Sequence, residues 1–445
     1  MDKEQKEFHK SRRKEFSRLI GKDSIAIIFG STHQNKSYDG DFEFKQFKNF
    51  FYLTGFTEPN AALMISSSAI KTGNGEGAGS ASEILYVQKK DPLRETWNGK
   101  RLGFGKVRQE LDIAGAKENF DLKNTLNSMS FSKFRKLYIN FSEVIKLNGE
   151  MNEIITEFIN RLNIISSNIE VIDASYILGK MRSVKTPYEI MMIKKACGIS
   201  ADSYIETMKI IKPGLNEYHV QASLEFHYKN SGSRENAYHP IVAGGDNACI
   251  LHYESNDQIL QNGDLLLIDS GAEYNYYCSD ITRTFPVNGK FTEEQKLIYN
   301  IVLKANKECI KKIKPGVSYL YLRNFSDKIL ADGLFRAGLL KDKKKVRMYS
   351  LHGVGHHIGL DTHDAVTSGK TAMEDNDKLK QGNVLTIEPG LYFPKNTKGI
   401  PLKFHGIGVR IEDDILVTRN GCENLTKIVP KETIEIERAM SAKTT

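Results

Sequence analysis

The chain has 445 residues, of which 40% are hydrophobic and 27% are charged, and both values are ordinary for a globular protein. This length exceeds the usual size of a single core and predicts two domains. The formal net charge is +8, but lysine and arginine are spread along the chain. The densest basic runs, at residues 10–13 and 341–347, contain no interleaved aromatic residues, so we expect no nucleic-acid partner.

The cysteines and the apolar segments of the chain indicate the compartment in which the protein is found. The five cysteines form no CxxC pair and their number is odd, which argues against a disulfide framework and fits a reducing compartment. The first 20 residues are charged throughout, so they do not resemble a secretory signal. Nowhere do the roughly 18 apolar residues of a membrane span run together. We therefore expect a cytoplasmic protein with no membrane partner.

The first part of the chain reads as alternating short strands and helices. Apolar runs predict buried strands at residues 24–29, 61–66, 84–87 and 136–140. Residues 66–82 are mostly small and polar, which predicts a mobile hairpin tip between two strands. Their glycines do not favour a phosphate-binding loop, because a strand and not a helix follows them.

Strong helix signals begin near residue 180. The sequence Thr-Pro-Tyr-Glu at residues 186–189 is a capping box with proline at the first helical position, and predicts a long helix to about Ile211. Another helix is expected from about Asn216. Later in the chain, residues 292–295 predict the cap of a second long helix, which is again followed by a helix.

The strand that follows each helix pair also has a matching pattern. Residues 263–271 read Gly-Asp-Leu-Leu-Leu-Ile-Asp-Ser-Gly, and residues 382–390 read Gly-Asn-Val-Leu-Thr-Ile-Glu-Pro-Gly. Both strands end in a carboxylate before a turn. We therefore interpret residues 180–445 as two similar α/β halves with a carboxylate at the same place in each.

Asp269 ends the first of these strands, and a second strand is predicted at residues 279–285. If the turn between them centres on Tyr274 and Asn275, Asp269 lies directly opposite Asp280, with Cβ atoms about 4.5–5.5 Å apart. Two negative charges at this distance are unfavourable unless a cation or a proton lies between them.

The second half repeats this arrangement of carboxylates. Glu388 ends one strand, and Glu412 is placed in the strand around residues 408–411, with Asp413 and Asp414 interpreted as the turn that follows. Four carboxylates on adjoining strands suit hard divalent ions such as manganese. With one neutral histidine, two divalent ions neutralise four negative charges and can share a hydroxide, because the pKa of a bound water falls from about 15.7 towards about 7.

Histidines supply the remaining type of ligand. Four of them lie in the glycine-rich stretch at residues 351–364, namely His352, His356, His357 and His363. No GxSxG or HExxH motif competes for the catalytic role. Cys278, beside Asp280, fits a small buried residue better than a ligand or a nucleophile.

Together, the motifs at residues 266–271, 279–285, 352–356, 388–390 and 410–414 resemble those of the pita-bread metallopeptidases, and within these the aminopeptidase P family of Xaa-Pro aminopeptidases. Residues 50–59 and 96–103 are similar to that family's N-terminal domain. The resemblance implies a mixed α/β (α+β) protein. A smaller α/β domain at residues 1–180 would precede a pita-bread catalytic domain at residues 181–445 with an internal pseudo-two-fold.

The resemblance also implies a set of metal ligands for two divalent ions, with manganese first and zinc or cobalt as alternatives. Asp269 would bind one ion, His356 and Glu388 the other, and Asp280 and Glu412 would bridge both. The implied catalytic residues are Glu388, which would receive the proton of the attacking water, His363, which would steady the scissile carbonyl and its oxyanion, and His252.

The residues implied for substrate binding surround these ligands. His252 and His352 would frame the proline pocket with Tyr392 and Arg410, and Arg410 shares a strand face with Glu412 if the strand continues. Tyr238 would lie close to the metals. Trp97 would approach the active site of a neighbouring subunit in a homodimer or homotetramer.

The implied activity is hydrolysis of the bond between a peptide's first residue and a proline at position two. Prolidase, which acts on Xaa-Pro dipeptides with the same fold and metals, is separated from this interpretation only by the N-terminal domain. Methionine aminopeptidase lacks such a large N-terminal domain. A catalytically inactive pita-bread binding protein would have lost ligands, whereas all five ligand positions are present here.

Overall fold

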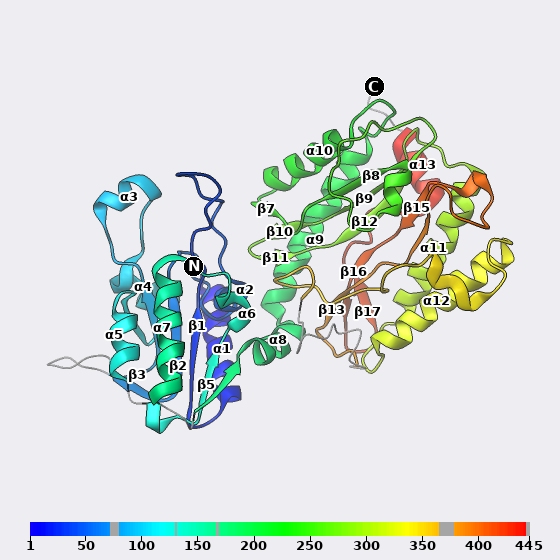
Figure 1. Cartoon of the computed structure of the whole chain (residues 1–445). Coiled ribbons are helices and arrows are strands. Elements are labelled where there is room, and N and C mark those ends of the chain that lie inside the picture. The colour runs from blue at the N-terminus through cyan, green and yellow to red at the C-terminus, as the bar shows by residue number, and fades with distance from the viewer. Residues whose placement is uncertain (72–79, 130, 166–168, 365–377, 442–445) are drawn as a thin grey trace. The chain divides into compact units, whose positions relative to one another are not determined.

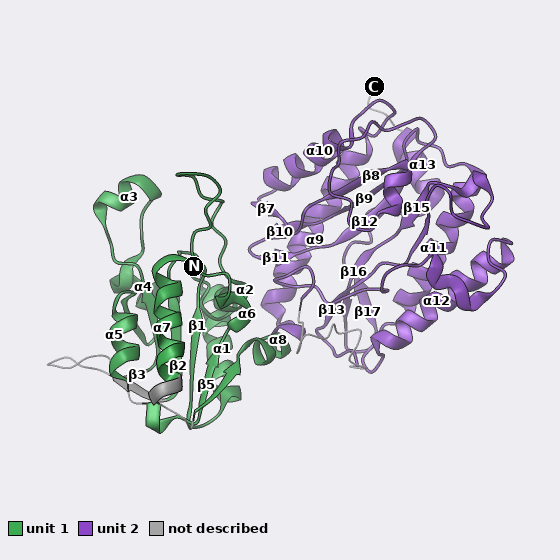
Figure 2. Ribbon diagram, viewed as in Figure 1, with its two compact units in different colours: residues 1–181 green, residues 182–445 purple. Residues whose placement is uncertain are grey.

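The structure is a computed structural model that describes residues 1–71, 80–129, 131–165, 169–364 and 378–441. They form two compact units, Met1–Met181 and Arg182–Thr445, shown in green and purple in Figure 2. Each unit contains a hydrophobic core of its own. Among the described residues, no helix combines the length and the apolar character needed to cross a lipid bilayer.

A mixed sheet and its surrounding helices make up the first unit (Figure 1). Its six described strands pair in the order β4-β3-β2-β1-β5-β6. The central strand β1 (Ser24–Phe29) is antiparallel to β2 and parallel to β5, and all of its residues are buried. The other elements are β2 (Ala62–Lys71), β3 (Ser80–Val87), β4 (Gly115–Glu118), β5 (Lys136–Ile139), β6 (Glu170–Asp173), α1 (Lys3–Ile20), α2 (Lys48–Thr54), α3 (Pro92–Asn98), α4 (Gly103–Leu111), α5 (Asp121–Ser128), α6 (Phe141–Val144), α7 (Gly149–Ile165) and α8 (Ser175–Ser183).

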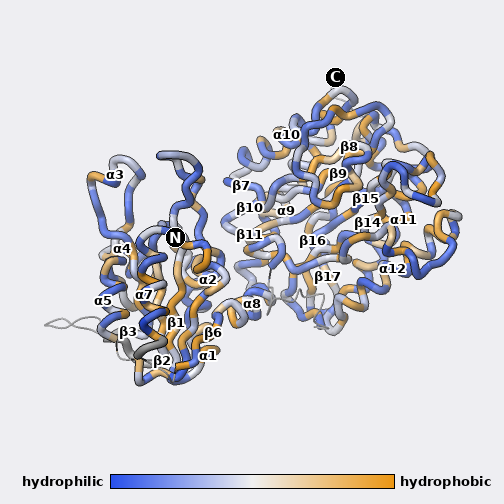
Figure 3. The backbone as a smooth tube through the Cα atoms, in the orientation of Figure 1, coloured by the Kyte–Doolittle hydropathy of each residue, from blue (hydrophilic) through white to orange (hydrophobic). Residues whose placement is uncertain are grey.

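The apolar runs predicted as strands in this unit are confirmed. Residues 24–29 coincide with β1, and the other three runs fall on β2, β3 and β5. Figure 3 shows the apolar character of β1, whose alternate residues pack with apolar residues of α5 and α7, such as Leu122 and Phe158. The strands β2 and β3 continue beyond the predicted runs. The hairpin tip was predicted at residues 66–82, but residues 66–71 and 80–82 belong to β2 and β3, and residues 72–79 lie outside the described part of the chain.

The second unit repeats one order of elements. In its first half the helices α9 (Pro187–Met208) and α10 (Glu217–Asn230) precede the antiparallel pair β9 and β12. In its second half α11 (Glu293–Lys312) and α12 (Tyr319–Arg336) precede the antiparallel pair β13 and β16. The remaining bounds are β7 (Glu235–Asn236), β8 (Ile241–Gly244), β9 (Leu265–Ser270), β10 (Ala272–Tyr274), β11 (Tyr277–Cys278), β12 (Ile281–Pro286), β13 (Val384–Ile387), β14 (Gly390–Phe393), β15 (Ile407–Arg410), β16 (Asp413–Val417), β17 (Cys422–Asn424) and α13 (Thr433–Ser441).

Both predicted capping boxes are present. The backbone amide of Glu189 donates to the hydroxyl of Thr186, and the Glu189 carboxylate accepts from the Thr186 amide at 2.8 Å. Thr292 and Gln295 make the same reciprocal pair, with the Thr292 amide 2.9 Å from Oε1 of Gln295. Each N-cap is worth about 1 kcal/mol, so local sequence fixes where the first helix of each half begins.

The predicted register of the hairpin that carries Asp269 and Asp280 is wrong by two residues. The turn is made by Asn275 and Tyr276, with φ of 48° and 71°, as a two-residue loop with two positive φ angles requires. Asp269 therefore pairs with Thr282. A shift by two residues keeps every side chain on its own face of the sheet, so Asp269 and Asp280 still project to the same side.

Candidate active site

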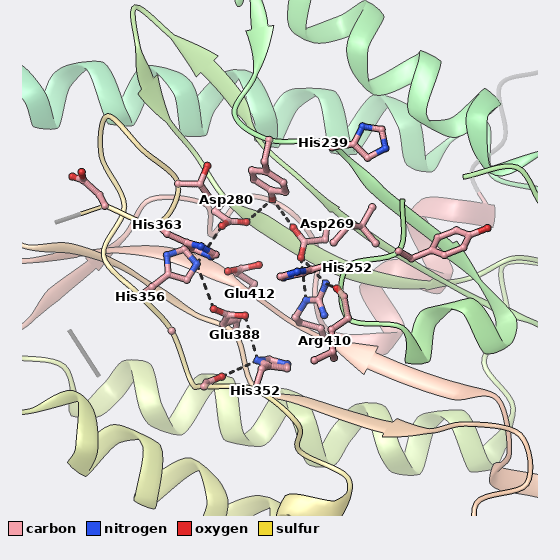
Figure 4. A pocket seen from close by; sticks show the side chains of 18 of the residues that line it. His239, His252, Asp269, Asp280, His352, His356, His363, Glu388, Arg410 and Glu412 are labelled. Carbon is pink, nitrogen blue, oxygen red and sulfur yellow. Dashed lines mark hydrogen bonds and ion pairs between the residues drawn. The ribbon is translucent and has the colours of Figure 1, made fainter. Parts of the chain in front are cut away.

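A cavity of about 640 Å³ lies in the second unit. Figure 4 shows side chains from both halves of the unit converging on it. Its walls include ten of the residues predicted for the site, namely Tyr238, His252, Asp269, Asp280, His352, His356, His363, Glu388, Arg410 and Glu412. Tyr392 joins them through a hydrogen bond of 2.7 Å to His352. Trp97 belongs to the first unit, where its side chain lies on α3 and is 88% exposed.

The four predicted carboxylates lie at or near strand ends. Asp269 is the penultimate residue of β9, and Asp280 directly precedes β12. Glu388 follows the last residue of β13. Glu412 was predicted to lie within a strand, but it lies between β15 and β16. Its backbone amide donates to the carbonyl of Thr282 at 3.0 Å, which ties the two halves together at the site.

Three of the predicted ligands form a compact donor set. Asp280, His356 and Glu412 each offer one atom, and these atoms lie within 4.8 Å of one another. Nε2 of His356 is 3.5 Å from Oδ2 of Asp280 and 3.5 Å from Oε1 of Glu388. Nδ1 of His356 lies 3.1 Å from the carbonyl oxygen of His357 and donates to it. Burial lowers the pKa of His356, but Asp280 and Glu388 outweigh burial and raise the pKa to about 9, so Nε2 would act as a ligand atom once a cation replaces its proton.

Asp269 makes different contacts from the other three carboxylates. Arg410 donates to its Oδ2 through Nε at 3.1 Å and Nη2 at 2.6 Å. The hydroxyl of Tyr238 lies 2.5 Å from both Oδ1 of Asp269 and Oδ1 of Asp280. Tyr238 therefore bridges the two carboxylates of the hairpin, and Arg410 balances one of them.

The crowding of carboxylates changes their protonation. Burial raises the pKa of Glu388 to about 7, although His356 and Arg410 oppose the shift. Burial and the neighbouring carboxylates also raise the pKa values of Asp280 and Glu412. Burial acts on Asp269 in the same direction, but the charge of Arg410 holds its pKa below the usual value. The site thus has an excess of negative charge, and four carboxylates with one imidazole fit divalent cations.

A chain of hydrogen bonds fixes the tautomer of His352. Nη1 of Arg410 donates to the Tyr392 hydroxyl at 2.8 Å, which in turn donates to Nε2 of His352 at 2.7 Å. Nδ1 of His352 lies 2.8 Å from the carbonyl oxygen of Gly353 and therefore carries the proton. Burial and Arg410 lower the pKa of His352 to about 3, so the ring is neutral at pH 7.

His363 and His252 complete the polar wall of the cavity. The ring of His363 meets that of His356 edge-on, with centroids 4.3 Å apart. Burial and the charge of His356 lower the pKa of His363 to about 4, so His363 is a neutral hydrogen-bond donor at pH 7. His252 is exposed. Among the described residues, its side chain makes no hydrogen bond.

The interpretation of Asp413 and Asp414 as a turn is wrong, because both begin β16 and are fully buried. Asp413 pairs with Arg283 at 2.7 Å and with Lys431 at 2.5 Å. Asp414 accepts from the backbone amide of Asp280 at 2.9 Å. Cations therefore balance the charge of Asp413, whereas the donors to Asp414 are the backbone amide of Asp280 and the thiol of Cys197.

Sequence reasoning also missed a buried ion pair beside His363. The carboxylate of Asp364 contacts Arg182 and lies 3.0 Å from Nζ of Lys185. Burial raises the pKa of Asp364, but Arg182 and Lys185 outweigh it and hold the pKa at about 2. The His-Asp pair at residues 363–364 was a visible signal, whereas nothing in the sequence marked its two distant cations.

Comparisons with known proteins agree with this geometry. The sequence model of metallopeptidase family M24 matches residues 191–419, and that of the aminopeptidase P N-terminal domain matches residues 9–138. An Xaa-Pro aminopeptidase of Haemophilus influenzae is 36% identical over 98% of this chain and 97% of its own length. An Xaa-Pro aminopeptidase of Escherichia coli is 35% identical over 94% of each chain.

Solved structures extend the likeness to the whole fold. Aminopeptidase PepP of Pseudomonas aeruginosa superposes with a TM-score of 0.88 at 34% identity, covering 98% of both chains. Aminopeptidase P of E. coli with the inhibitor Pro-Leu gives 0.88 at 33% identity and the same coverage. The predicted α/β fold, a pita-bread domain preceded by a smaller N-terminal domain, is confirmed. The chain belongs to metallopeptidase family M24, within the aminopeptidase P group.

Proposed function

We propose that this chain is an Xaa-Pro aminopeptidase that uses two divalent metal ions to release the first residue of peptides with proline at position two. The observation that carries the proposal is the convergence of four carboxylates and His356 on one cavity, with Asp269, Asp280 and Glu412 buried and Glu388 partly exposed. Residues 181–445 form the catalytic domain in this proposal, and residues 1–180 form the N-terminal domain. The near full-length likeness to proteins named Xaa-Pro aminopeptidase supports the substrate class.

The proposed metal ligands follow from the donor set. Asp269 would hold one ion, His356 and Glu388 would hold the other, and Asp280 and Glu412 would be shared by the two. Two divalent cations balance four carboxylates, and an oxygen-rich set favours manganese, with zinc or cobalt as alternatives. One relative was solved as "Zn substituted E. coli Aminopeptidase P in complex with product", which supports zinc as an alternative. When bound, the ions supply Lewis-acid activation of water.

The protein's own residues move the proton and orient the substrate. Glu388 accepts the proton of the attacking water, a role favoured by a pKa that burial raises to about 7. Neutral His363 donates a hydrogen bond to the scissile carbonyl oxygen as it becomes an oxyanion. His252 and His352, with Tyr392, form flat walls for the proline ring. The hydrogen bonds from Arg410 through Tyr392 hold His352 in one tautomer.

We extend the proposal to assembly and location. A homodimer or homotetramer would place Trp97 near the active site of a neighbouring subunit. The exposure of Trp97 (88%) and of Leu93 (80%) on the same short helix supports this, because such side chains are commonly covered by a partner. A cytoplasmic location is supported by the five cysteines, which all lie in the described part of the chain and form no disulfide.

One assay separates this function from the alternatives. A dipeptide and a tripeptide, each with proline at position two, are incubated with the protein and added manganese, and the products are identified by mass spectrometry. We expect the tripeptide to be cut once, after its first residue. Cleavage of the dipeptide alone would indicate a prolidase. Absence of both reactions with metal restored would indicate an inactive binding protein.

A further inference from the structure

The segment that carries His252 forms one wall of the cavity. Leu251, His252, Tyr253 and Glu254 all line it. The imidazole of His252 makes no hydrogen bond within the described part of the chain, and the residue is exposed. The position of this ring therefore depends on the backbone that carries it.

One buried carboxylate on another element holds this backbone. Glu217 is the first residue of α10 and is fully buried. Its Oε1 accepts from the amide of Gly244 at 2.7 Å and from Nδ2 of Asn247 at 3.1 Å. Its Oε2 accepts from the hydroxyl of Tyr253 at 2.9 Å and from the amide of Gln258 at 3.0 Å.

The four donors are spread over the whole segment. Gly244 and Asn247 lie at its start, Tyr253 lies in its middle directly after His252, and Gln258 lies at its end. The backbone amide of Glu217 returns a further bond of 2.9 Å to the carbonyl of Gln258. A single carboxylate thus fixes both ends and the centre of residues 244–258.

The contacts of Glu217 differ from those of a structural ion pair. Within the residues that the structure describes, no lysine, arginine or histidine lies within 4.0 Å of its carboxylate, so backbone and side-chain donors alone compensate the buried charge. Hydrogen bonds to an ionised acceptor are shorter and stronger than neutral ones. A neutral side chain at this position would loosen several contacts with the segment at once.

We infer that Glu217 is a positioning residue for His252, an inference that rests on the proposed function of His252. Glutamine at position 217 would turn one of the two acceptor atoms into a donor that faces other donors, so the His252 segment would lose its fixed place. A displacement of about 1 Å at a reacting group can cost about 100-fold in rate. We therefore expect the effect of Glu217 to pass through His252. Because Gly244 also pairs with Leu266 of β9, the metal content of the variant shows whether the strand that carries Asp269 is disturbed as well.

The test is a double-mutant cycle on the manganese-loaded protein. We expect Glu217→Gln to lower kcat/KM for an Xaa-Pro-Xaa tripeptide by about 10-fold to 100-fold while metal content stays at the wild-type level. The double variant Glu217→Gln/His252→Ala should be no slower than His252→Ala alone, because two residues that act as one unit are not additive. Thr292→Ala, which removes the cap of α11 and leaves the hydrogen bonds of Glu217 in place, is the matched control and should lose stability but keep kcat/KM.

Amide hydrogen exchange gives a readout that needs no activity. Exchange over residues 244–258 should rise in Glu217→Gln and stay at the wild-type level in Thr292→Ala. Unchanged exchange there, full additivity in the cycle, or a wild-type kcat/KM in Glu217→Gln would each overturn the inference. Failure of the wild-type protein to cleave the tripeptide would instead refute the proposed function, and the exchange result would still decide whether Glu217 holds the segment.

Discussion

Replacing Glu388 by glutamine should have opposite effects on stability with and without metal. In the metal-free protein, burial raises the pKa of Glu388 from 4.5 to about 7. Below pH 4.5 this carboxyl group is protonated in both the folded and the unfolded chain, so its burial costs no ionisation energy. As the pH rises through the unfolded and then the folded pKa, the folded state becomes the less favourable place for the charge. Metal-free wild type should therefore lose stability between about pH 4.5 and 7.

The size of the effect follows from the two pKa values. Since each tenfold change in acidity is worth about 1.4 kcal/mol, the ionised Glu388 costs about 3 kcal/mol above pH 7. Glutamine carries no charge at any pH. Metal-free Glu388→Gln should thus unfold at a temperature about 6–12 °C higher than metal-free wild type at pH 8. This advantage should disappear near pH 4.5.

Bound metal should reverse the order of stability of wild type and Glu388→Gln. Glu388 is a proposed ligand, so wild type gains more from bound manganese than the variant does. Thermal unfolding is measured at pH 5 and pH 8, each with a chelator and with excess manganese. Glu225→Gln removes a carboxylate outside the cavity that accepts from Gln221 and Asn236, and it controls for the loss of one charge. The reasoning is refuted if wild type is the more stable protein in all four conditions.

Three further predictions concern single residues. The wild-type protein should bind about two metal ions per chain. Asp280→Ala and Glu412→Ala should each bind fewer ions and lose activity. Full activity in either variant would contradict a dinuclear site. His352→Ala should keep near-normal metal content and lose catalysis on Xaa-Pro peptides, and a half-empty metal site would show that the roles of His352 and His356 are exchanged. Asp364→Asn should lower the free energy of unfolding by about 2 kcal/mol at pH 6, because the folded pKa of Asp364 is held at about 2. That difference should shrink in denaturant titrations as the pH falls from 4 towards 2, and a difference independent of pH would contradict the assignment.

Features encoded within a few residues could be predicted from the sequence. The caps at Thr186 and Thr292 depend on partners three residues away, and both were found where expected. The strands β1 and β9 are buried on both faces, so continuous apolar runs marked them. Asp269 and Glu388 were visible because their strands end in matching motifs, and the histidines were visible because four of them lie together at residues 351–364.

Features that depend on distant partners could not be predicted. The hairpin register needed two positive φ angles at Asn275 and Tyr276, and a tyrosine gives no signal for that conformation. Asp413 could be buried in a strand only because Arg283 and Lys431 neutralise it. No local sequence pattern marks the role of Glu217, since the donors to its carboxylate lie 27 to 41 residues further along the chain.

The central claim is that a free amino terminus selects the bond one residue inward. We expect the free amine to dock beside the metal site, and N-acetylation removes the amine's charge and its lone pair while leaving the rest of a peptide intact. The most direct measurement compares a free Xaa-Pro-Xaa tripeptide with its acetylated form, with manganese restored, by mass spectrometry. We predict that the free peptide is cut once, after the first residue, and that the acetylated peptide is not cut. Equal cleavage of both peptides would contradict an aminopeptidase.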